Sequence, residues 1–273
     1  MLKKKDAIIS LRKLQLPSRY LQREVRVDFF MPPDFRNKNE VSLLLINDGQ
    51  NMEELGLSAI LSDFYRQNSI RPLLCVGIYC GDDRKNEYGT AFVADYKGRG
   101  AKAALYAQFI LEELLLFIHI QTGIVSFKEK SFAGFSLGGL SALDMVWNHP
   151  YEFLKAGVFS GSFWWRSKGL DEGYIEATDR IMHARIREGS YYPWLKFFFE
   201  TGTLDETEDR NNNGIIDCID DTIGLIEELE NKGYKRHSDI EYLELKDGRH
   251  DVATWAVAMP VFLKWGWGNN LKM

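Results

Sequence analysis

The sequence has few cysteines and no excess of positive charge. Its 273 residues include three cysteines, Cys75, Cys80 and Cys218. This small, odd number gives no disulfide framework and favours a reducing compartment. The formal net charge is -5, and no basic stripe is interleaved with aromatic residues. These features argue against a nucleic-acid partner.

Long apolar runs are also missing. The longest apolar segment, 110–120, is interrupted by two glutamates and a histidine, so we expect no membrane partner. The basic start at Lys3–Lys5 is followed by more charge at Arg12 and Lys13 instead of an apolar segment and a cleavage site. A cytoplasmic location is therefore expected. The sequence carries no signal for an oligomeric state.

Internal repeats, low-complexity linkers and composition shifts are absent as well. The length suits one large α/β domain or two small ones, and a hydrophobic content of 45% supports a substantial core. We therefore expect a single domain over 1–273, with the N-terminal ~20 residues peripheral.

What the sequence does contain is an alternation of apolar strands and amphipathic helices. Strands are predicted at 24–30, 41–46, 72–79, 129–135, 155–159, 194–200 and 240–245. Helices are predicted at 53–65, 101–120, 137–148, within 174–187, and at 219–231 and 252–265. This order indicates an α/β fold with a mostly parallel central sheet and helices on both faces. The first strand is expected to pair antiparallel, at an edge.

The stretch Gly134-Phe135-Ser136-Leu137-Gly138 fits the G-x-S-x-G pattern of a nucleophile elbow. A serine on a sharp strand-to-helix turn needs small neighbours, which the two glycines supply. The following helix directs free backbone N–H groups toward an anion beside the serine. The pattern alone also fits an ordinary glycine-rich turn, so its context matters.

A serine nucleophile needs a histidine and an orienting carboxylate, which should follow strands of a parallel sheet. His250 lies between the last strand and the last helix, whereas the other histidines lie at helix ends, inside a helix or before a strand. Asp205 is the first carboxylate after the glycine turn that ends the 194–200 strand. Glu206, Glu208 and Asp209 compete with it for this role.

An oxyanion hole needs two backbone donors. Leu137, directly after the serine, offers one N–H group. The second is expected from the loop after the 41–46 strand, from Gln50 or alternatively Gly49. An ordinary Asp-Gly turn would show the same residues.

Four segments together resemble a known family. They are Leu45-Ile46-Asn47-Asp48-Gly49-Gln50-Asn51, Ala133-Gly134-Phe135-Ser136-Leu137-Gly138-Gly139-Leu140, Phe159-Ser160-Gly161-Ser162-Phe163-Trp164-Trp165, and Gly248-Arg249-His250-Asp251 with Trp255 and Phe262-Leu263. Over 24–265 the chain resembles the esterase D-like branch of the α/β-hydrolases, which includes enterochelin esterases, feruloyl esterases and S-formylglutathione hydrolases. The resemblance implies an α/β-hydrolase fold and the Ser136-Asp205-His250 assignment.

The segment 209–220 fits a calcium loop of the EF-hand type. The predicted ligands are Asp209, Asn211, Asn213, the carbonyl of Ile215, Asp217 and Asp220, with Gly214 at the sharp turn. An Asx-rich surface turn fits the pattern equally well. A bound calcium ion would stiffen the loop that carries Asp205 and would take no part in the chemistry.

Aromatic residues cluster in loops near the proposed site. Trp164, Trp165 and Tyr88 are candidates for contacts with a bulky acyl or alcohol group, although a packed cap would look the same. Arg84 and Arg99 lie in the loop after the 72–79 strand, where we expect solvated charges more than contacts to an anionic substrate.

These patterns favour a serine carboxylic-ester hydrolase with no metal or organic cofactor in its chemistry. By the family resemblance, its partner would be a small-molecule ester that is bulky or linked to a carbohydrate or siderophore. The alternatives are an acyltransferase on the same fold and a non-catalytic, calcium-stabilised binding module.

Overall fold

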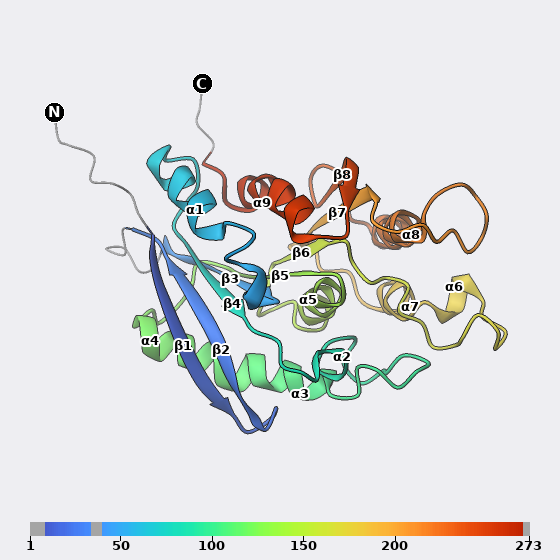
Figure 1. The fold of residues 1–273 in the computed structure, drawn as a ribbon, viewed down its shortest axis with the longest axis horizontal. Coiled ribbons are helices and arrows are strands. Elements are labelled where there is room, and N and C mark those ends of the chain that lie inside the picture. The colour runs from blue at the N-terminus through green and yellow to red at the C-terminus, as the bar shows by residue number, and fades with distance from the viewer. Residues whose placement is uncertain (1–8, 34–39, 270–273) are drawn as a thin grey trace.

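The computed structural model describes residues 9–33 and 40–269. One sheet of eight strands runs through the described part, in the order β1-β2-β4-β3-β5-β6-β7-β8 (Figure 1). The strands are β1 (Ser10–Ser18), β2 (Arg23–Met31), β3 (Ser42–Asn47), β4 (Leu73–Ile78), β5 (Lys130–Phe135), β6 (Lys155–Phe159), β7 (Lys196–Leu204) and β8 (Ile240–Arg249). Strands β3 to β8 pair in parallel, and β1 and β2 are antiparallel. The predicted mostly parallel α/β architecture is confirmed.

The N-terminal part of the sheet differs from the prediction. β2 is antiparallel to β4, as expected, but it does not form the edge because β1 pairs with it from Ser10↔Met31 to Ser18↔Arg23. Residues 10–18 therefore form the edge strand of the sheet. The sequence pattern indicates a strand at 10–18 only weakly, because Leu16 and Ser18 are the only buried residues of β1. The basic residues of 3–5 lie outside the described residues.

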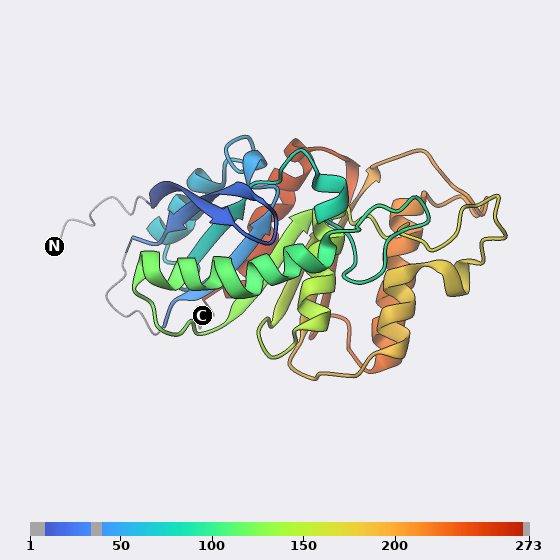
Figure 2. The ribbon, with the colours of Figure 1, turned by 90° about the horizontal axis from the view of Figure 1, so that it is seen from below.

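Two layers of helices cover the sheet (Figures 1 and 2). One core cluster joins the sheet to α1 (Leu57–Arg66) and α9 (Val252–Trp267). The other core cluster joins the sheet to the helices on its opposite face. They are α3 (Ala103–Gln108), η3 (Phe109–Leu114), α4 (Leu115–Thr122), α5 (Leu137–Asn148), α7 (Ile181–Glu188) and α8 (Asp217–Lys232). Helices on both faces bury both sides of the parallel strands, which explains their continuous apolar runs.

Two predicted helices have a different internal structure. The helix expected within 174–187 is divided into α6 (Glu176–Asp179) and α7, since Arg180 has an extended backbone. The helix expected at 101–120 contains the π-helical segment η3. The loop after β4 contains the short helix α2 (Arg84–Glu87).

The segment Ala103–Thr122 is long and apolar enough to cross a membrane by length and composition alone. It crosses one face of the sheet (Figure 2), and its residues Tyr106, Phe109, Ile110 and Ile118 are part of the core. Core helices pass the same length and composition test. Burial of these side chains explains part of the apolar sequence, whereas Leu116 and Ile120 of the same segment are exposed.

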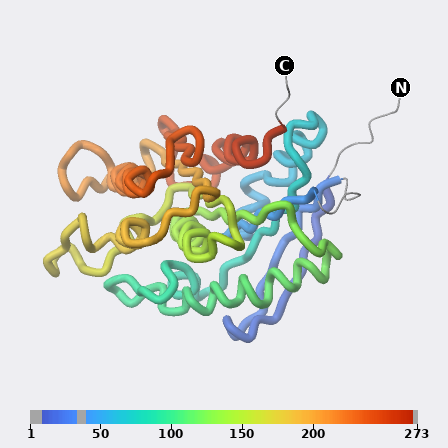
Figure 3. Tube along the Cα trace, turned by 180° about the vertical axis from the view of Figure 1, so that it is seen from behind, coloured from blue at the N-terminus to red at the C-terminus, as the bar shows by residue number. Residues whose placement is uncertain are grey.

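The parallel strands bring distant segments to one edge of the sheet. Ser136 follows β5, Asp205 follows β7 and His250 follows β8. Because all six parallel strands have their carboxyl ends at the same edge, these residues are grouped there. The long loops after β6 and β7 extend at the end of the molecule opposite the β1–β2 hairpin (Figure 3).

Candidate active site

Ser136 occupies a strained turn between β5 and α5. Its φ of 54° and ψ of -123° are unusual for a residue other than glycine. A Cβ atom on Gly134 would lie 2.3 Å from the carbonyl oxygen of Gly138. The close approach of β5 to α5 therefore requires glycine, and it leaves the serine partly exposed at the helix N-terminus.

A second serine lies beside the candidate nucleophile. Ser162, in the loop after β6, has its Oγ atom 3.3 Å from Ser136 Oγ. The Ser162 N–H group donates to the Ser136 carbonyl at 3.2 Å, and the Ser136 N–H group donates to Phe159 at 2.8 Å. The end of β6 and the loop after it are thus hydrogen-bonded to the turn that carries Ser136.

Asp205 is buried and held by three donors. Its Oδ1 atom accepts from Ser160 Oγ at 3.1 Å, and its Oδ2 atom accepts from the Gly202 N–H group and Cys218 Sγ, each at 3.1 Å. Trp255 Nε1 donates to the Ser160 hydroxyl at 2.9 Å. The carboxylate is therefore fixed in orientation, as a group that orients a histidine must be.

His250 faces Asp205, with Nδ1 3.8 Å from Asp205 Oδ1. Catalytic hydrogen bonds are commonly long in structures without substrate and shorten when it binds. Burial is the main cause that lowers the pKa of His250, the charge of Arg84 lowers it further, and Asp205 and Asp251 raise it. A lowered pKa keeps the imidazole neutral at neutral pH, ready to accept a proton.

The predicted oxyanion loop forms the 3-10 helix η2 (Gly49–Asn51). Asp48, just before it, has a left-handed backbone with φ 60°. Gly49 is buried, whereas Gln50 is exposed. Both follow β3, at the sheet edge that carries the candidate catalytic residues. Backbone N–H groups at the start of a helix have no intrahelical acceptor, so those of Gln50 and Leu137 remain the candidate donors.

The predictions of substrate contacts need correction. Tyr88 and Trp165 are completely buried, so neither can touch a substrate in this structure. The Tyr88 hydroxyl instead accepts from the Asp48 N–H group at 3.2 Å, and Trp165 Nε1 donates to Thr90 at 3.1 Å. Trp164 is partly exposed and remains the candidate aromatic wall.

Arg84 and Arg99 are not solvated loop charges. Arg84 binds both carboxylate oxygens of Asp48 at 2.7 Å. Arg99 binds Asp95 and lies 4.8 Å from the ring of Trp164. Arg84 and Asp48 are 36 positions apart, so no local pattern predicts that pair, whereas Arg99 and Asp95 are only four positions apart, a spacing at which a local pair could have been expected.

Two further carboxyl groups lie near Asp205 in the chain, Glu200 buried and Glu206 half-buried. Burial, together with the charge of Asp205, raises the pKa of Glu200 to about 8. Burial also raises the pKa of Glu206 to about 7. Neither Glu200 oxygen has a hydrogen-bond partner among the described residues. A pKa of about 8 leaves Glu200 mostly protonated at neutral pH.

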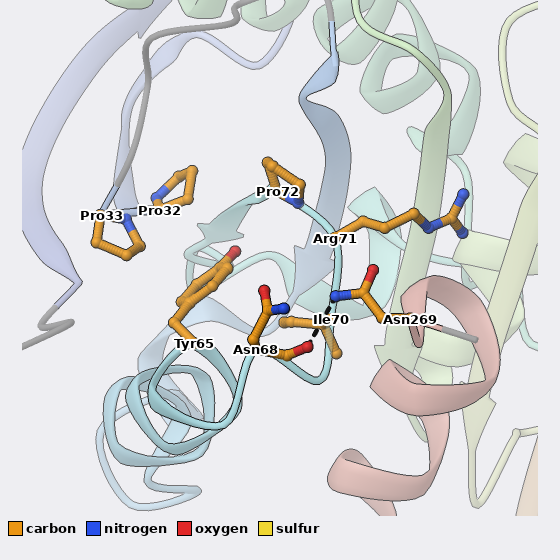
Figure 4. Close-up of a pocket in the computed structure, with 8 residues that line it drawn as sticks. All are labelled: Pro32, Pro33, Tyr65, Asn68, Ile70, Arg71, Pro72 and Asn269. Carbon is orange, nitrogen blue, oxygen red and sulfur yellow. Dashed lines mark hydrogen bonds between the residues drawn. The ribbon is translucent and has the colours of Figure 1, made fainter. Parts of the chain in front are cut away.

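The pocket drawn in Figure 4 lies elsewhere. It has a volume of about 590 Å³ and is lined by Pro32, Pro33, Tyr65, Asn68, Ile70, Arg71, Pro72 and Asn269 (Figure 4). Residues 70–72 directly precede β4, so this pocket is at the amino end of that strand. The candidate catalytic residues follow the carboxyl ends.

The predicted calcium loop closes on itself. Asn211 Nδ2 and Asn213 Nδ2 donate to the two oxygens of Asp220 at 3.0 and 3.2 Å, and Asp209 accepts from the N–H groups of Asn213 and Gly214. Asp217 instead accepts from the N–H group of Arg210 at 2.9 Å. No group of three or more His, Cys, Asp or Glu side chains in 9–33 and 40–269 is placed to hold a metal ion, but amide and carbonyl oxygens also serve calcium.

A strained serine at a strand-to-helix turn, followed by an acid and a histidine at the same sheet edge, defines an α/β-hydrolase fold. The model of the family described as Putative esterase matches residues 18–265. The chain belongs to this esterase family, which confirms the resemblance predicted from the four segments.

Solved structures show the same fold. The enterobactin esterase of Shigella flexneri is 19% identical, with a TM-score of 0.68 over 95% of this chain and 60% of that one. A ferulic acid esterase is 16% identical, with a TM-score of 0.66 over 96% of this chain and 98% of that one. A siderophore hydrolase of Aspergillus nidulans is 17% identical, with a TM-score of 0.66 and the same two coverages.

The chain spans about 60% of the length of the enterobactin esterases that it matches. No curated protein matches the chain.

Proposed function

We propose that this protein is a serine carboxylic-ester hydrolase that uses Ser136, His250 and Asp205. The observation that carries the proposal is the backbone of Ser136, whose φ of 54° is held between two glycines at the carboxyl edge of the sheet. A strained backbone of this kind is costly and typical of functional positions. The esterase family match supports the reaction class.

In the proposed reaction, Ser136 Oγ attacks the ester carbonyl carbon while His250 accepts the hydroxyl proton. The N–H groups of Leu137 and Gln50 stabilise the resulting oxyanion. The tetrahedral intermediate then releases the alcohol, which takes the proton from the imidazolium. Water then attacks the acyl-enzyme carbonyl while His250 accepts a proton from it. The bond from the acyl carbon to Ser136 Oγ breaks, Oγ takes the proton from the imidazolium, and the acid leaves.

Asp205 accepts a hydrogen bond from His250 Nδ1–H once the 3.8 Å separation closes. This fixes the tautomer that leaves the other ring nitrogen free to accept the serine proton, and it stabilises the imidazolium that forms. Ser160, Gly202 and Cys218 keep the carboxylate from turning away.

The proposed substrate is a bulky, carbohydrate- or siderophore-linked ester. Structural neighbours named as enterobactin, ferulic acid and siderophore esterases or hydrolases support this class. The partly exposed ring of Trp164, backed by Arg99 at 4.8 Å, offers an aromatic wall for such a group.

A panel of esters tests the proposal. We expect the protein to cleave p-nitrophenyl acetate slowly and to prefer a feruloyl or catechol-bearing ester, with turnover measured by liquid chromatography. Acetyl, feruloyl and thioester substrates should be compared at equal concentration, with and without an acceptor alcohol. If the new ester accumulates over free acid, the protein is an acyltransferase. If no substrate is cleaved, the hydrolase proposal fails.

We further propose that 209–220 binds a structural calcium ion. Asn211 and Asn213 are hydrogen-bonded to Asp220, and Asp209 to the Gly214 N–H group, so one loop already gathers these four side chains. The Ile215 carbonyl would complete the set of oxygen ligands. Adding 5 mM calcium to chelator-treated protein should raise the Tm by about 2–5 °C, because binding to the folded state stabilises it. Asp209→Ala should abolish the rise, whereas Asp171→Ala, at an exposed site, should retain it. If calorimetry detects no heat when calcium is added to the protein, the calcium proposal fails.

A further inference from the structure

One buried ion pair connects the oxyanion loop to the nucleophile elbow. Arg84, in α2, binds Asp48 with Nε and Nη2, each at 2.7 Å. The side chains are 29% and 2% exposed, respectively. A bidentate, largely buried arginine–carboxylate pair fixes geometry as well as charge.

The Asp48 end of this pair is part of the oxyanion loop. Asp48 has a left-handed backbone, φ 60° and ψ 48°, which a residue other than glycine keeps only when its surroundings hold it. Its N–H group donates to the Tyr88 hydroxyl at 3.2 Å, and its Oδ1 atom accepts from Gln50 Nε2 at 3.1 Å. The carboxylate thus holds the segment that presents the Gln50 N–H group.

The same two side chains also reach the elbow. Arg84 Nη2 donates to the Phe135 carbonyl, directly before Ser136, at 3.4 Å. A Cβ atom on Gly138 would lie 2.5 Å from Asp48 Oδ2, so the carboxylate packs against the elbow glycine. Asn47 Nδ2 also donates to the Gly138 carbonyl, at 2.8 Å.

We propose that Arg84 is a positioning residue that sets the distance between the two oxyanion donors, the N–H groups of Gln50 and Leu137. It does so through Asp48, before the Gln50 donor, and through the carbonyl of Phe135, the last residue of β5 before the elbow. This inference rests on the proposed hydrolase function. An oxyanion hole works only when both donors are in place before charge develops, so a small displacement of one loop is costly.

Direct binding of an anionic substrate does not explain Arg84. The Nε–Nη2 edge, which would grip a carboxylate, is already occupied by Asp48. The guanidinium also lies 5.1 Å from the ring of buried Tyr88. The charge instead acts on His250, whose other charged neighbours are Asp205 and Asp251.

The experiment compares Arg84→Gln, Arg84→Lys and Arg23→Gln. Arg23 makes the matching bidentate pair, with Glu87 of α2 at 2.8 and 2.6 Å and with a similar burial. We expect Arg84→Gln to lower kcat by about 10–100-fold with KM changed less than ~3-fold, because the loss falls on the transition state. Arg84→Lys should recover part of kcat, and Arg23→Gln should stay within ~2-fold of wild type.

The pH profile separates positioning from loss of stability. Removing the Arg84 charge removes one cause that lowers the pKa of His250. The acid limb of kcat/KM should therefore move to higher pH in Arg84→Gln and stay unchanged in Arg23→Gln. Amide hydrogen exchange at 47–52 should be faster in Arg84→Gln alone, a readout that needs no substrate.

Three results are decisive. Wild-type kcat and unchanged exchange in Arg84→Gln would overturn the inference while leaving the hydrolase proposal intact. Equal losses in Arg84→Gln and Arg23→Gln, with no movement of the acid limb, would show a role in stability only and would also overturn it. Wild-type protein that cleaves no ester would remove the hydrolase proposal, and the inference with it.

Discussion

Ser136→Ala is expected to lower kcat for ester hydrolysis by about 10⁴–10⁶-fold, because no other group can form the acyl-enzyme in its place. Residual activity would come from substrate binding and the oxyanion donors. Ser162 Oγ lies 3.3 Å away. Ser162 is in the loop after β6, however, and in the described chain no helix begins directly after it as α5 does after Ser136. The measurement is steady-state hydrolysis of p-nitrophenyl acetate, together with labelling by a fluorophosphonate and mapping of the labelled peptide.

Ser131→Ala is the matched control on the same strand. Ser131 is fully buried in β5, and its Oγ atom has no hydrogen-bond partner in the described part of the chain. This variant should keep kcat within ~2-fold and keep the label on Ser136, because it removes no group near the reacting atoms. A Ser136→Ala protein that folds, yet cleaves the ester at the wild-type rate, would rule out the mechanism.

The sheet and the order of the site residues could be predicted because their signals are local. Each central strand is a buried apolar run, and chain order fixes which residues follow it. The mostly parallel α/β architecture was predicted correctly on this basis, and the resemblance to the esterase family added the α/β-hydrolase fold. Leu137–Asn148 and Lys155–Phe159 match the predicted ranges at both ends, since glycine, proline and polar residues mark their boundaries.

The contacts that fix the site could not be predicted, because they join residues far apart in the chain. Trp255 reaches Ser160 across 95 positions, and Asn47 reaches Gly138 across 91. Composition gives no signal for such pairs. The same limit made Tyr88 and Trp165 look like substrate contacts, since an aromatic residue in a loop can point outward or, as here, fill the core.

The choice among the acidic residues also needed three-dimensional information. Asp205, Glu206, Glu208 and Asp209 are almost consecutive in the chain. Glu208 is exposed, and the Asp209 carboxylate accepts hydrogen bonds from backbone N–H groups of the 209–220 loop. Asp205 faces His250, and its place as the first carboxylate after the turn is consistent with the role proposed for it.

Asp205→Asn is expected to lower kcat by about 10³–10⁴-fold, because an amide cannot hold the histidine in the required tautomer. The three donors around Asp205 strengthen the effect. Ser160 Oγ, the Gly202 N–H group and Cys218 Sγ all donate to the carboxylate oxygens, so an NH₂ group at either position would face a donor. Substrate binding does not depend on this carboxylate, so KM should change by less than ~3-fold.

Glu206→Gln and Glu200→Gln are the matched controls, since each replaces a neighbouring carboxyl group with the isosteric amide. Glu200 is buried and Glu206 half-buried, and burial raises the pKa of both groups, so their amide forms resemble the protonated acids. Each should retain kcat within ~3-fold at pH 7. If Glu206→Gln loses activity and Asp205→Asn does not, Glu206 is the orienting acid. If all three variants keep wild-type kcat, His250 acts without a carboxylate, and the proposed triad is wrong.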